Sequence, residues 1–228
     1  MIVSIHQPEH LPWPHLIEKI ALSDAFVVLD NVQFKKNNVQ NRNKLISKNG
    51  EIFWATVPVE KGKLNDLIIE KKIVGLSWRK QYLSKIVQNY KQQASFKEIY
   101  EPLEKLIFNS DSSLCNLNIS IINFLLYELK IKTQIIRSSE LNVNGKKNEL
   151  LINILNELSA KEYLAGLGSK SYLDLNLFER NTIKVNFFNP IPWKYPMLHS
   201  TQGLSIFDYM FRNGILKTRK KIDETRKN

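Results

Sequence analysis

The stretch MIVSIHQPEHLPWPHLIEKIALSDAFVVLD, residues 1–30, decides the fold of this 228-residue chain. Residues 2–6 form an apolar run that predicts a buried strand. Three prolines then favour a non-helical loop, because proline fixes φ and restricts the residue before it. The apolar spacing over residues 15–21 predicts a helix, and residues 25–29 predict a second strand. Strand, loop, helix and strand within thirty residues indicate a βαβ unit, and therefore a parallel sheet with a right-handed crossover.

The rest of the chain predicts a hairpin followed by alternating helices and strands. The pair Asn49-Gly50 lies between two strand-like segments, which is typical of a tight hairpin turn. The remaining expected elements are helices over 77–93, 96–108, 111–129 (capped by Asp111), 148–158, 173–180 and 205–212 (ended by Gly214), with strands over 133–136, 162–165 and 182–188. Together these predict an α/β fold: a mixed, largely parallel, Rossmann-like sheet flanked by helices, with a β-hairpin insertion and a helical segment.

This pattern predicts a single α/β domain over residues 1–216, followed by a basic C-terminal tail over residues 217–228. The tail, KTRKKIDETRKN, is charged and poor in apolar residues. We therefore expect a frayed, solvated end, the alternative being a basic arm that contacts an anion.

The charge balance is strongly basic. The chain has 33 Lys and Arg against 22 Asp and Glu, a formal net charge of +11. Such an excess attracts phosphates, nucleotides, RNA or an anionic membrane surface. The alternative is compositional, since many of the lysines alternate with Ile and Asn as in a chain encoded by an AT-rich genome.

The lone cysteine and the absence of a long apolar run bear on location. Cys115 cannot form an internal disulfide and lies in an apolar pattern, so we expect a thiol in the core of a protein from a reducing compartment. No apolar run approaches the roughly 20 residues that span a bilayer, and the first residues do not resemble a signal peptide. These features together predict a cytoplasmic protein.

Polar side chains follow the first two expected strands. His6 and Gln7 lie at the end of the first strand and Asp30 at the end of the second, where parallel sheets bind their ligands. Histidine transfers protons near neutral pH, and Trp13 in the following loop offers a flat surface for a sugar or a base. The alternative is that the prolines and Trp13 only pack the loop.

Two further segments are candidate binding sites. Residues 29–44 carry amides and cations suited to sugar hydroxyls and phosphate: Gln33, Lys35, Asn41, Arg42 and Asn43. The sequence GLGSKS at 166–171 fails the P-loop pattern but can hold an anion on backbone N–H groups, with Gly168 and Ser169 at its centre. A solvated loop and a plain glycine turn are the respective alternatives. The sequence has no CxxC, HExxH or EF-hand pattern, so we expect neither a metal nor a cofactor.

Beyond these patterns, the chain resembles the WbqC-like family. The resemblance covers nearly the whole chain and rests on His6-Gln7-Pro8, Pro12-Trp13, Ser23-Asp24, the block Leu29-Asp30-Asn31-Val32-Gln33-Phe34, Asn41-Arg42-Asn43, Thr56-Val57-Pro58 and the segments 163–174 and 204–214. Two features depart from the family pattern. The family more often has Tyr at the position of His10 and Gly-Tyr or Gly-Phe at Pro14-His15, so His10 and His15 are poor candidates for shared catalytic groups.

The resemblance implies a role in bacterial surface-polysaccharide assembly, that is, in O-antigen (lipopolysaccharide) or capsule biosynthesis. The leading hypothesis is a transferase that acylates, or aminoacylates, the amine of a nucleotide-linked amino sugar. The acyl donor is open between an aminoacyl-tRNA and a thioester, and the oligomeric state is also open. A nucleotidyl- or glycosyltransferase would normally need a metal-binding carboxylate pair, and no DxD is present. A non-catalytic module that binds RNA or polysaccharide machinery is the third alternative.

In the leading hypothesis His6 and Asp30 are catalytic. His6 is the general base, and Asp30 orients it or accepts the proton. The expected substrate-binding residues are Gln7, Trp13, Gln33, Lys35, Asn41, Arg42, Asn43, Gly168, Ser169, Tyr172 and Asp208.

Overall fold

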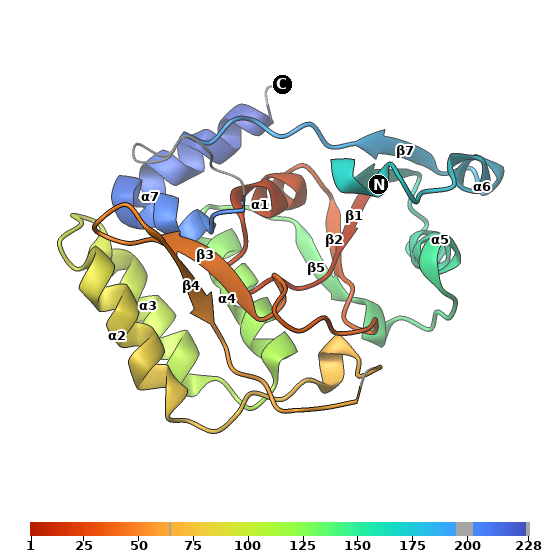
Figure 1. Cartoon of the computed structure of the whole chain (residues 1–228). Coiled ribbons are helices and arrows are strands. Elements are labelled where there is room, and N and C mark those ends of the chain that lie inside the picture. Colours follow the sequence, from red (N-terminus) through yellow and green to blue (C-terminus); the bar gives the residue numbers. More distant parts are fainter. Residues whose placement is uncertain (64, 195–202, 227–228) are drawn as a thin grey trace.

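Five parallel strands form the central sheet of the computed structural model, in the order β5-β2-β1-β6-β7 (Figure 1). Their bounds are β1 Ile2–His6, β2 Ala25–Val28, β5 Gln134–Arg137, β6 Glu162–Ala165 and β7 Lys184–Phe187. Every pair of neighbours is parallel. The structure describes residues 1–63, 65–194 and 203–226. The predicted α/β class, with a largely parallel sheet flanked by helices, is confirmed.

Helices cover both faces of this sheet (Figure 1). They are α1 Pro14–Ala21, α2 Trp78–Tyr90, α3 Phe96–Asn109, α4 Leu114–Glu128, α5 Lys147–Glu157, α6 Leu175–Arg180 and α7 Ile206–Thr225, with short 3₁₀ helices at Ile68–Glu70, Ser138–Glu140 and Leu167–Ser169. Side chains alternate between the two faces of a strand. Phe26 and Val28 of β2 therefore pack with α1, α2, α3, α4 and α7, whereas Ala25 and Val27 pack with α5 and α6. No helix among the described residues combines the length and apolar character needed to cross a bilayer.

A second, two-stranded sheet is the predicted hairpin, with β3 Arg42–Ile46 antiparallel to β4 Ile52–Thr56. The turn places Gly50 at φ 85°, a left-handed conformation that glycine adopts without strain. The outer edge of β3 is covered, because the backbone N–H of Ser205 donates to the carbonyl oxygen of Lys44 at 3.0 Å.

The order of the strands creates a switch point between β1 and β6. From β1 the chain moves to β2 and then to β5 on one side, returns to β6 on the other side of β1, and ends at β7. In doubly wound sheets the crossovers diverge at such a point and leave a crevice at the carboxyl ends of the strands. His6 is the last residue of β1 and therefore lies at this crevice.

Helix α4 begins three residues later than the sequence pattern predicts. The residue that caps it is Ser113, whose hydroxyl accepts from the backbone N–H of Asn116 at 3.2 Å, and the predicted cap Asp111 was wrong. The Asp111 carboxylate instead accepts from the backbone N–H of Ser113 and from the side-chain amide of Asn116. Both residues have capping chemistry, and the position at which the chain turns decided between them.

The segment expected to fray is helical as far as Thr225. Gly214, with φ 81° and ψ 165°, is not helical and divides α7 into two halves, so the helix predicted over 205–212 ends at Gly214 as expected and a second helix follows it. Beyond Gly214, Ile222 is 1% exposed, and the hydroxyl of Thr225 donates to the buried carboxylate of Glu18 in α1 at 3.1 Å. The prediction of a solvated tail is thus wrong for residues 217–225, because Thr218, Ile222 and Thr225 share one helix face that is buried. Residues 227–228 of that segment lie outside the described residues.

Ile222→Ala should destabilise the protein by about 2–5 kcal/mol, since it removes a fully buried aliphatic side chain. Leu216→Ala in the same helix is the matched control. Leu216 is 71% exposed, and its truncation should change stability by less than about 0.5 kcal/mol. Urea unfolding of both variants measures the difference. Equal effects would show that the second half of α7 does not pack on the core.

Candidate functional site

Two hollows meet at the switch point. The first, here called the α1 hollow, has a volume of about 280 Å³ and is lined by Ile5, His6, Trp13, His15, Leu16, Lys19, Tyr163, Gly166, Leu167, Gly168, Ser169, Tyr172, Phe188 and Pro190. The second, the α5 hollow, has a volume of about 690 Å³ and is lined by Ile5, His6, Gln7, Leu29, Val32, Lys147, Asn148, Leu150, Leu151, Tyr163 and Tyr172. His6, Tyr163 and Tyr172 border both, so the two hollows form one candidate site with aromatic walls.

His6 is held as a neutral imidazole with one free nitrogen. Its Nδ1 lies 2.9 Å from the carbonyl oxygen of Gln7. A carbonyl only accepts, so Nδ1 carries the proton and Nε2 keeps its lone pair. Burial, and secondly the positive charge of Lys19, lower the pKa of His6 below its usual value of 6.5. The hollows still leave 34% of the side chain exposed. A substrate can therefore reach a histidine whose Nε2 is unprotonated at neutral pH.

The carboxyl group of Glu9 and the amine of Lys19 are buried beside His6. Glu9 is 2% and Lys19 is 4% exposed. A Glu9 oxygen lies 3.8 Å from Nδ1 of His6 and the other accepts from the backbone N–H of Trp13, while Lys19 donates to the carbonyl oxygen of Ile5. Burial raises the pKa of Glu9 and lowers that of Lys19, and the attraction between the two opposes both shifts. Lys19, which lines the α1 hollow, thus loses its proton more readily than a surface lysine.

His15 lines the α1 hollow and forms a dyad with the buried carboxylate of Glu18. Its Nδ1 lies 2.7 Å from Glu18, which is fully buried. The other oxygen of Glu18 accepts from the indole N–H of Trp193 at 3.0 Å and from the hydroxyl of Thr225 at 3.1 Å. Because those donors hold the carboxylate in place, Glu18 fixes the orientation and tautomer of the His15 ring. The arrangement suits a second proton-transfer group.

The 166–169 segment closes the α1 hollow after β6. The hydroxyl of Ser169 donates to the carbonyl oxygen of Gly166 at 2.6 Å and tightens the turn. A methyl group built on Gly168 would meet no heavy atom within 4 Å, so this glycine leaves open space at the wall. Next to the turn, Tyr172 is 64% exposed at the mouth of the site.

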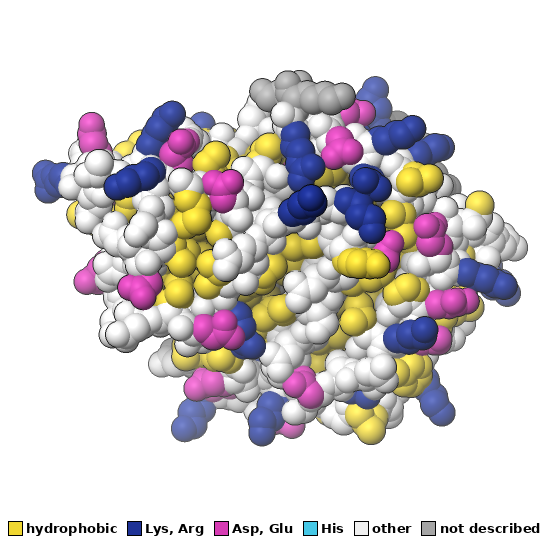
Figure 2. All heavy atoms as spheres, turned by 180° about the vertical axis from the view of Figure 1, so that it is seen from behind, with side chains coloured by type: hydrophobic (Ala, Val, Ile, Leu, Met, Phe, Trp, Pro, Cys, Tyr) yellow, Lys and Arg dark blue, Asp and Glu magenta, His cyan; other side chains and the backbone are white. Residues whose placement is uncertain are grey.

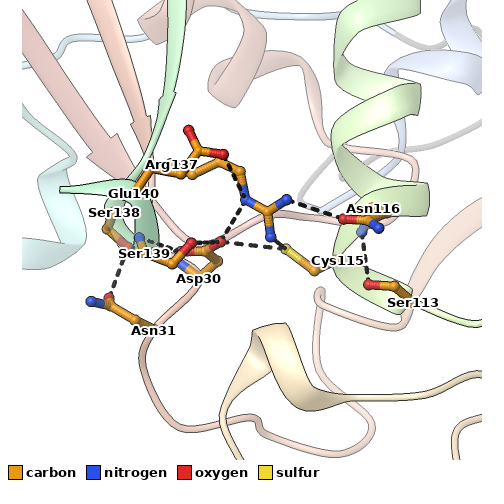
Figure 3. A network of polar contacts seen from close by, with 9 residues as sticks. All are labelled: Asp30, Asn31, Ser113, Cys115, Asn116, Arg137, Ser138, Ser139 and Glu140. Atoms are coloured by element: carbon orange, nitrogen blue, oxygen red, sulfur yellow. Dashed lines mark hydrogen bonds and ion pairs between the residues drawn. The ribbon is translucent and has the colours of Figure 1, made fainter.

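Asp30 does not reach His6, contrary to the sequence-based expectation. Figure 3 shows its fully buried carboxylate among residues of β5, the following 3₁₀ turn and α4. It accepts from Nε of Arg137 at 2.9 Å, from the hydroxyl of Ser138 at 3.0 Å, and from the N–H and hydroxyl of Ser139 at 2.9 and 2.8 Å. Within the described part of the chain no contact joins it to His6, which the Gln7 carbonyl orients instead. Asp30 clamps the end of β2 to the end of β5.

The side-chain amides of Asn41 and Asn43 are structural. Asn41 and Asn43 are each 2% exposed. The Asn41 amide donates to the carbonyl oxygen of Val57 at 3.1 Å, and the Asn43 amide to that of Leu11 at 2.8 Å. Asn43 ties the hairpin to the loop after β1, which positions Trp13, whereas Asn41 ties the start of β3 to the residue that follows β4. Their amide groups bind backbone rather than a ligand, and neither residue lines the site.

The carboxylate of Asp208 is also buried and also joins parts of the scaffold to one another. Its carboxylate accepts from the backbone N–H of Ile46 at 3.0 Å, from the hydroxyl of Tyr90 and from Nε of Arg212 at 3.1 Å. Three other predicted residues also lie outside the two hollows, and a fourth, Gln7, lines one of them. Arg42 stacks on Trp54, and Gln33 and Lys35 are exposed on the 29–40 loop, whereas Gln7 accepts from the amide of Gln40 and lines the α5 hollow.

The family of this chain follows from its similarity to known proteins. A model of the WbqC-like protein family matches residues 7–220. The chain belongs to the WbqC-like protein family. The curated protein "Uncharacterized protein Rv1507c" of Mycobacterium tuberculosis (strain ATCC 25618 / H37Rv) is 30% identical over 217 residues, covering 93% of this chain and 94% of the relative. No solved structure matches the chain significantly.

In this WbqC-like protein the site contains only part of the predicted set. The structure brings His6, Gln7, Trp13, Gly168, Ser169 and Tyr172 together and leaves Asp30, Gln33, Lys35, Asn41, Arg42, Asn43 and Asp208 outside. Sequence reasoning missed Lys19, Tyr163 and the dyad of His15 with Glu18. The signal for His15 and Lys19 was their spacing of four residues on the helix that follows the loop after β1. Within the described ranges no group of three or more His, Cys, Asp or Glu is placed to hold a metal.

Asp30→Ala should lower the free energy of unfolding by about 3 kcal/mol, because it leaves Arg137 and two serine hydroxyls without their shared acceptor. The measurement is urea unfolding at pH 7. Asp24→Ala, at the exposed start of β2, is the control, and it should cost less than Asp30→Ala because only the backbone N–H of Ile2 loses an acceptor. A fully stable Asp30→Ala variant would contradict the clamp.

His6→Asn should change how stability depends on pH. An unfolded histidine binds a proton below about pH 6.5, whereas folded His6, with its lowered pKa, does not. His6 therefore makes the folded state lose stability as the pH falls below 6.5. The variant should lose less stability than the unmodified protein between pH 7.5 and pH 5 in urea titrations. Parallel losses in both proteins would mean that His6 titrates normally.

Proposed function

We propose that this protein is a transferase that acylates, or aminoacylates, the amine of a nucleotide-linked amino sugar in bacterial O-antigen or capsule biosynthesis. The observation that supports this most is His6: a neutral imidazole at the switch point of a parallel sheet, with Nε2 free in a hollow that has aromatic walls. Acyl transfer to an amine requires a base of this kind.

In the proposed reaction, the amine nitrogen of the sugar attacks the acyl carbonyl carbon. A carbon–nitrogen bond forms, and the carbon–oxygen or carbon–sulfur bond to the donor breaks. Nε2 of His6 takes the proton that the amine loses. His6 then passes this proton from Nε2 to the leaving oxygen or sulfur. The amide product is neutral at nitrogen and His6 returns to its neutral form, so protons balance.

The walls of the site suit a nucleotide-linked sugar. Trp13, Tyr163 and Tyr172 offer flat apolar surfaces to a sugar ring or a base. The first turn of α5, with Lys147 and Asn148, borders the α5 hollow, and no side chain caps this helix. Its free backbone N–H groups and the lysine together attract the diphosphate of the substrate. Lys19 supplies a further positive charge beside the acceptor amine.

The basic surface supports a polyanionic acyl donor. Figure 2 shows Lys and Arg side chains spread over the face opposite that of Figure 1 and gathered most densely in its upper centre, with acidic side chains between them. A net charge of +11 favours contact with the phosphates of an aminoacyl-tRNA over contact with a neutral donor. Nucleotide-linked sugars and both donor classes are made in the cytoplasm, so this location is part of the proposal.

His6→Asn should lower kcat for acyl transfer by about 100- to 10,000-fold while KM changes little, since it removes the base without emptying the hollow. The assay combines nucleotide-linked amino sugars with aminoacyl-tRNA or acyl thioesters and follows the amide product by mass spectrometry. Tyr127→Phe is the control, because Tyr127 is 70% exposed on α4 and lines neither hollow. Full turnover by a folded His6→Asn variant would refute the assignment of His6.

A further inference from the structure

A third hollow lies between the hairpin and α2, away from the switch point. This hairpin hollow has a volume of about 300 Å³ and is lined by Phe53, Trp54, Ala55, Thr56, Pro58, Trp78, Gln81, Tyr82, Lys85 and Ile86. It shares no lining residue with the α1 or α5 hollow. None of its lining residues is acidic, and Lys85 is exposed at its margin. The hollow therefore favours a ligand with negative charge.

The free edge of β4 borders this hollow. The backbone N–H of Ser47 donates to the carbonyl oxygen of Glu51, and that of Val57 donates to the carbonyl oxygen of Asn41. These two bonds identify which opposing residues of the hairpin form hydrogen-bonded pairs. In an antiparallel pair, hydrogen-bonded pairs alternate with pairs whose N–H and C=O groups point outward. The backbones of Trp54 and Thr56 consequently point away from β3. Four consecutive residues of β4 line the hollow, as expected where the edge of a strand, rather than one of its faces, forms the wall.

An aromatic and cationic platform stands over this edge. One face of the hairpin carries Arg42, Lys44, Trp54 and Thr56. Arg42 lies opposite Thr56 and Lys44 opposite Trp54, and side chains two residues apart on a strand point to the same face. Trp54 is 41% exposed, the guanidinium of Arg42 lies 4.1 Å from the centre of its ring, and the Lys44 ammonium lies 5.4 Å from it. An exposed indole among cations is the arrangement that proteins use to stack an unpaired nucleobase.

Two buried donors in this region lack acceptors. Among the described residues, the indole N–H of Trp78, which is 9% exposed and lines the hollow, has no hydrogen-bond partner, and neither does Nε of Arg42. An unsatisfied buried donor is destabilising, and such groups are rare in folded proteins. A ligand that carries acceptor atoms would satisfy donors of this kind on binding.

We propose that the hairpin hollow is a nucleotide-binding site. The base lies against the edge of β4, where the outward N–H and C=O groups of Trp54 and Thr56 pair with the donors and acceptors of its edge. The Trp54 ring stacks on the base, and Lys85 binds the phosphate. An edge strand offers alternating donors and acceptors in one plane, as does the hydrogen-bonding edge of a base. The volume of about 300 Å³ limits the ligand to about one nucleotide.

This site stands apart from the proposed transferase reaction, because its evidence and its test involve binding alone. Isothermal titration calorimetry with AMP, GMP, CMP and UMP measures the affinity, and ribose 5-phosphate is the probe that lacks a base. His6→Asn provides the background in which the switch-point site is altered and the hairpin hollow is intact. Loss of turnover in that variant leaves the nucleotide affinity of the hairpin hollow unchanged.

Trp54→Leu should weaken binding about tenfold or more, since it removes the stacking ring and keeps an apolar side chain. Trp78→Phe removes the unpaired N–H together with part of the ring, and Lys85→Met removes the charge at the margin; each should weaken binding severalfold. Lys80→Met is the matched control, since Lys80 is exposed on the same helix and does not line the hollow. Thermal unfolding of each variant verifies that it is folded.

The outcomes separate a nucleotide site from simpler explanations. Base-dependent binding that Trp54→Leu weakens and Lys80→Met preserves supports the proposal. Equal binding of ribose 5-phosphate and AMP would show an anion site without base recognition and overturn it. Nucleotide binding that survives both Trp54→Leu and Trp78→Phe would place the ligand elsewhere and overturn it as well. Comparison of AMP with coenzyme A and with a short single-stranded RNA then identifies which nucleotide source fits best.

Discussion

The pairing of β1 with strands on both of its edges is the constraint on which the rest of the structure depends. Residues 3–6 pair with β2 and residues 2–3 with β6, and both ladders are parallel. A strand paired on both sides cannot shift its register without breaking both ladders, and a one-residue shift would also exchange the side chains that face its two sides. The carboxyl end of β1 is therefore a fixed point. His6 stands there, and the loop that follows leads directly into α1 with His15 and Lys19.

Buried polar contacts hold the loop after β1 to the rest of the molecule. The amide of Asn118 in α4 donates to the carbonyl oxygen of Gln40, and its oxygen faces the ring of His10, which also contacts the Tyr82 hydroxyl at 2.7 Å. Asn43 joins the same loop to the hairpin, and Asn41 joins the two ends of the hairpin to each other. A fully satisfied buried network gives rigidity and a unique geometry, because each member would be costly to leave unpaired. Residues of the family signature thus act on the site at a distance, by fixing the backbone that carries Trp13 and His6.

The titratable groups around the site are of two kinds: some hold the scaffold together, and one faces the hollow. Carboxylates with several donors, such as Asp30 and Glu18, are tied to the scaffold, whereas the neutral nitrogen of His6 faces the hollow. Glu18 links the site to the far end of the chain, because its partners Trp193 and Thr225 come from the C-terminal segment. The second half of α7 therefore stabilises α1 and the orientation of His15 together. This arrangement explains why a charged, apolar-poor segment is ordered.

The sequence by itself determined the local elements and the general location of the site. Period-two and helical spacing predicted β1, α1, β2 and the hairpin, and the rule that ligands bind at strand ends singled out His6 and Gln7, which line the hollows. Only the tertiary structure decided which polar residues face a cavity. Asp30 binds Arg137, which lies 107 positions further along the chain, and Glu18 binds Thr225, which lies 207 positions further along. A buried structural amide and a ligand-binding amide look alike in sequence, because their difference lies in the partners that long-range packing supplies.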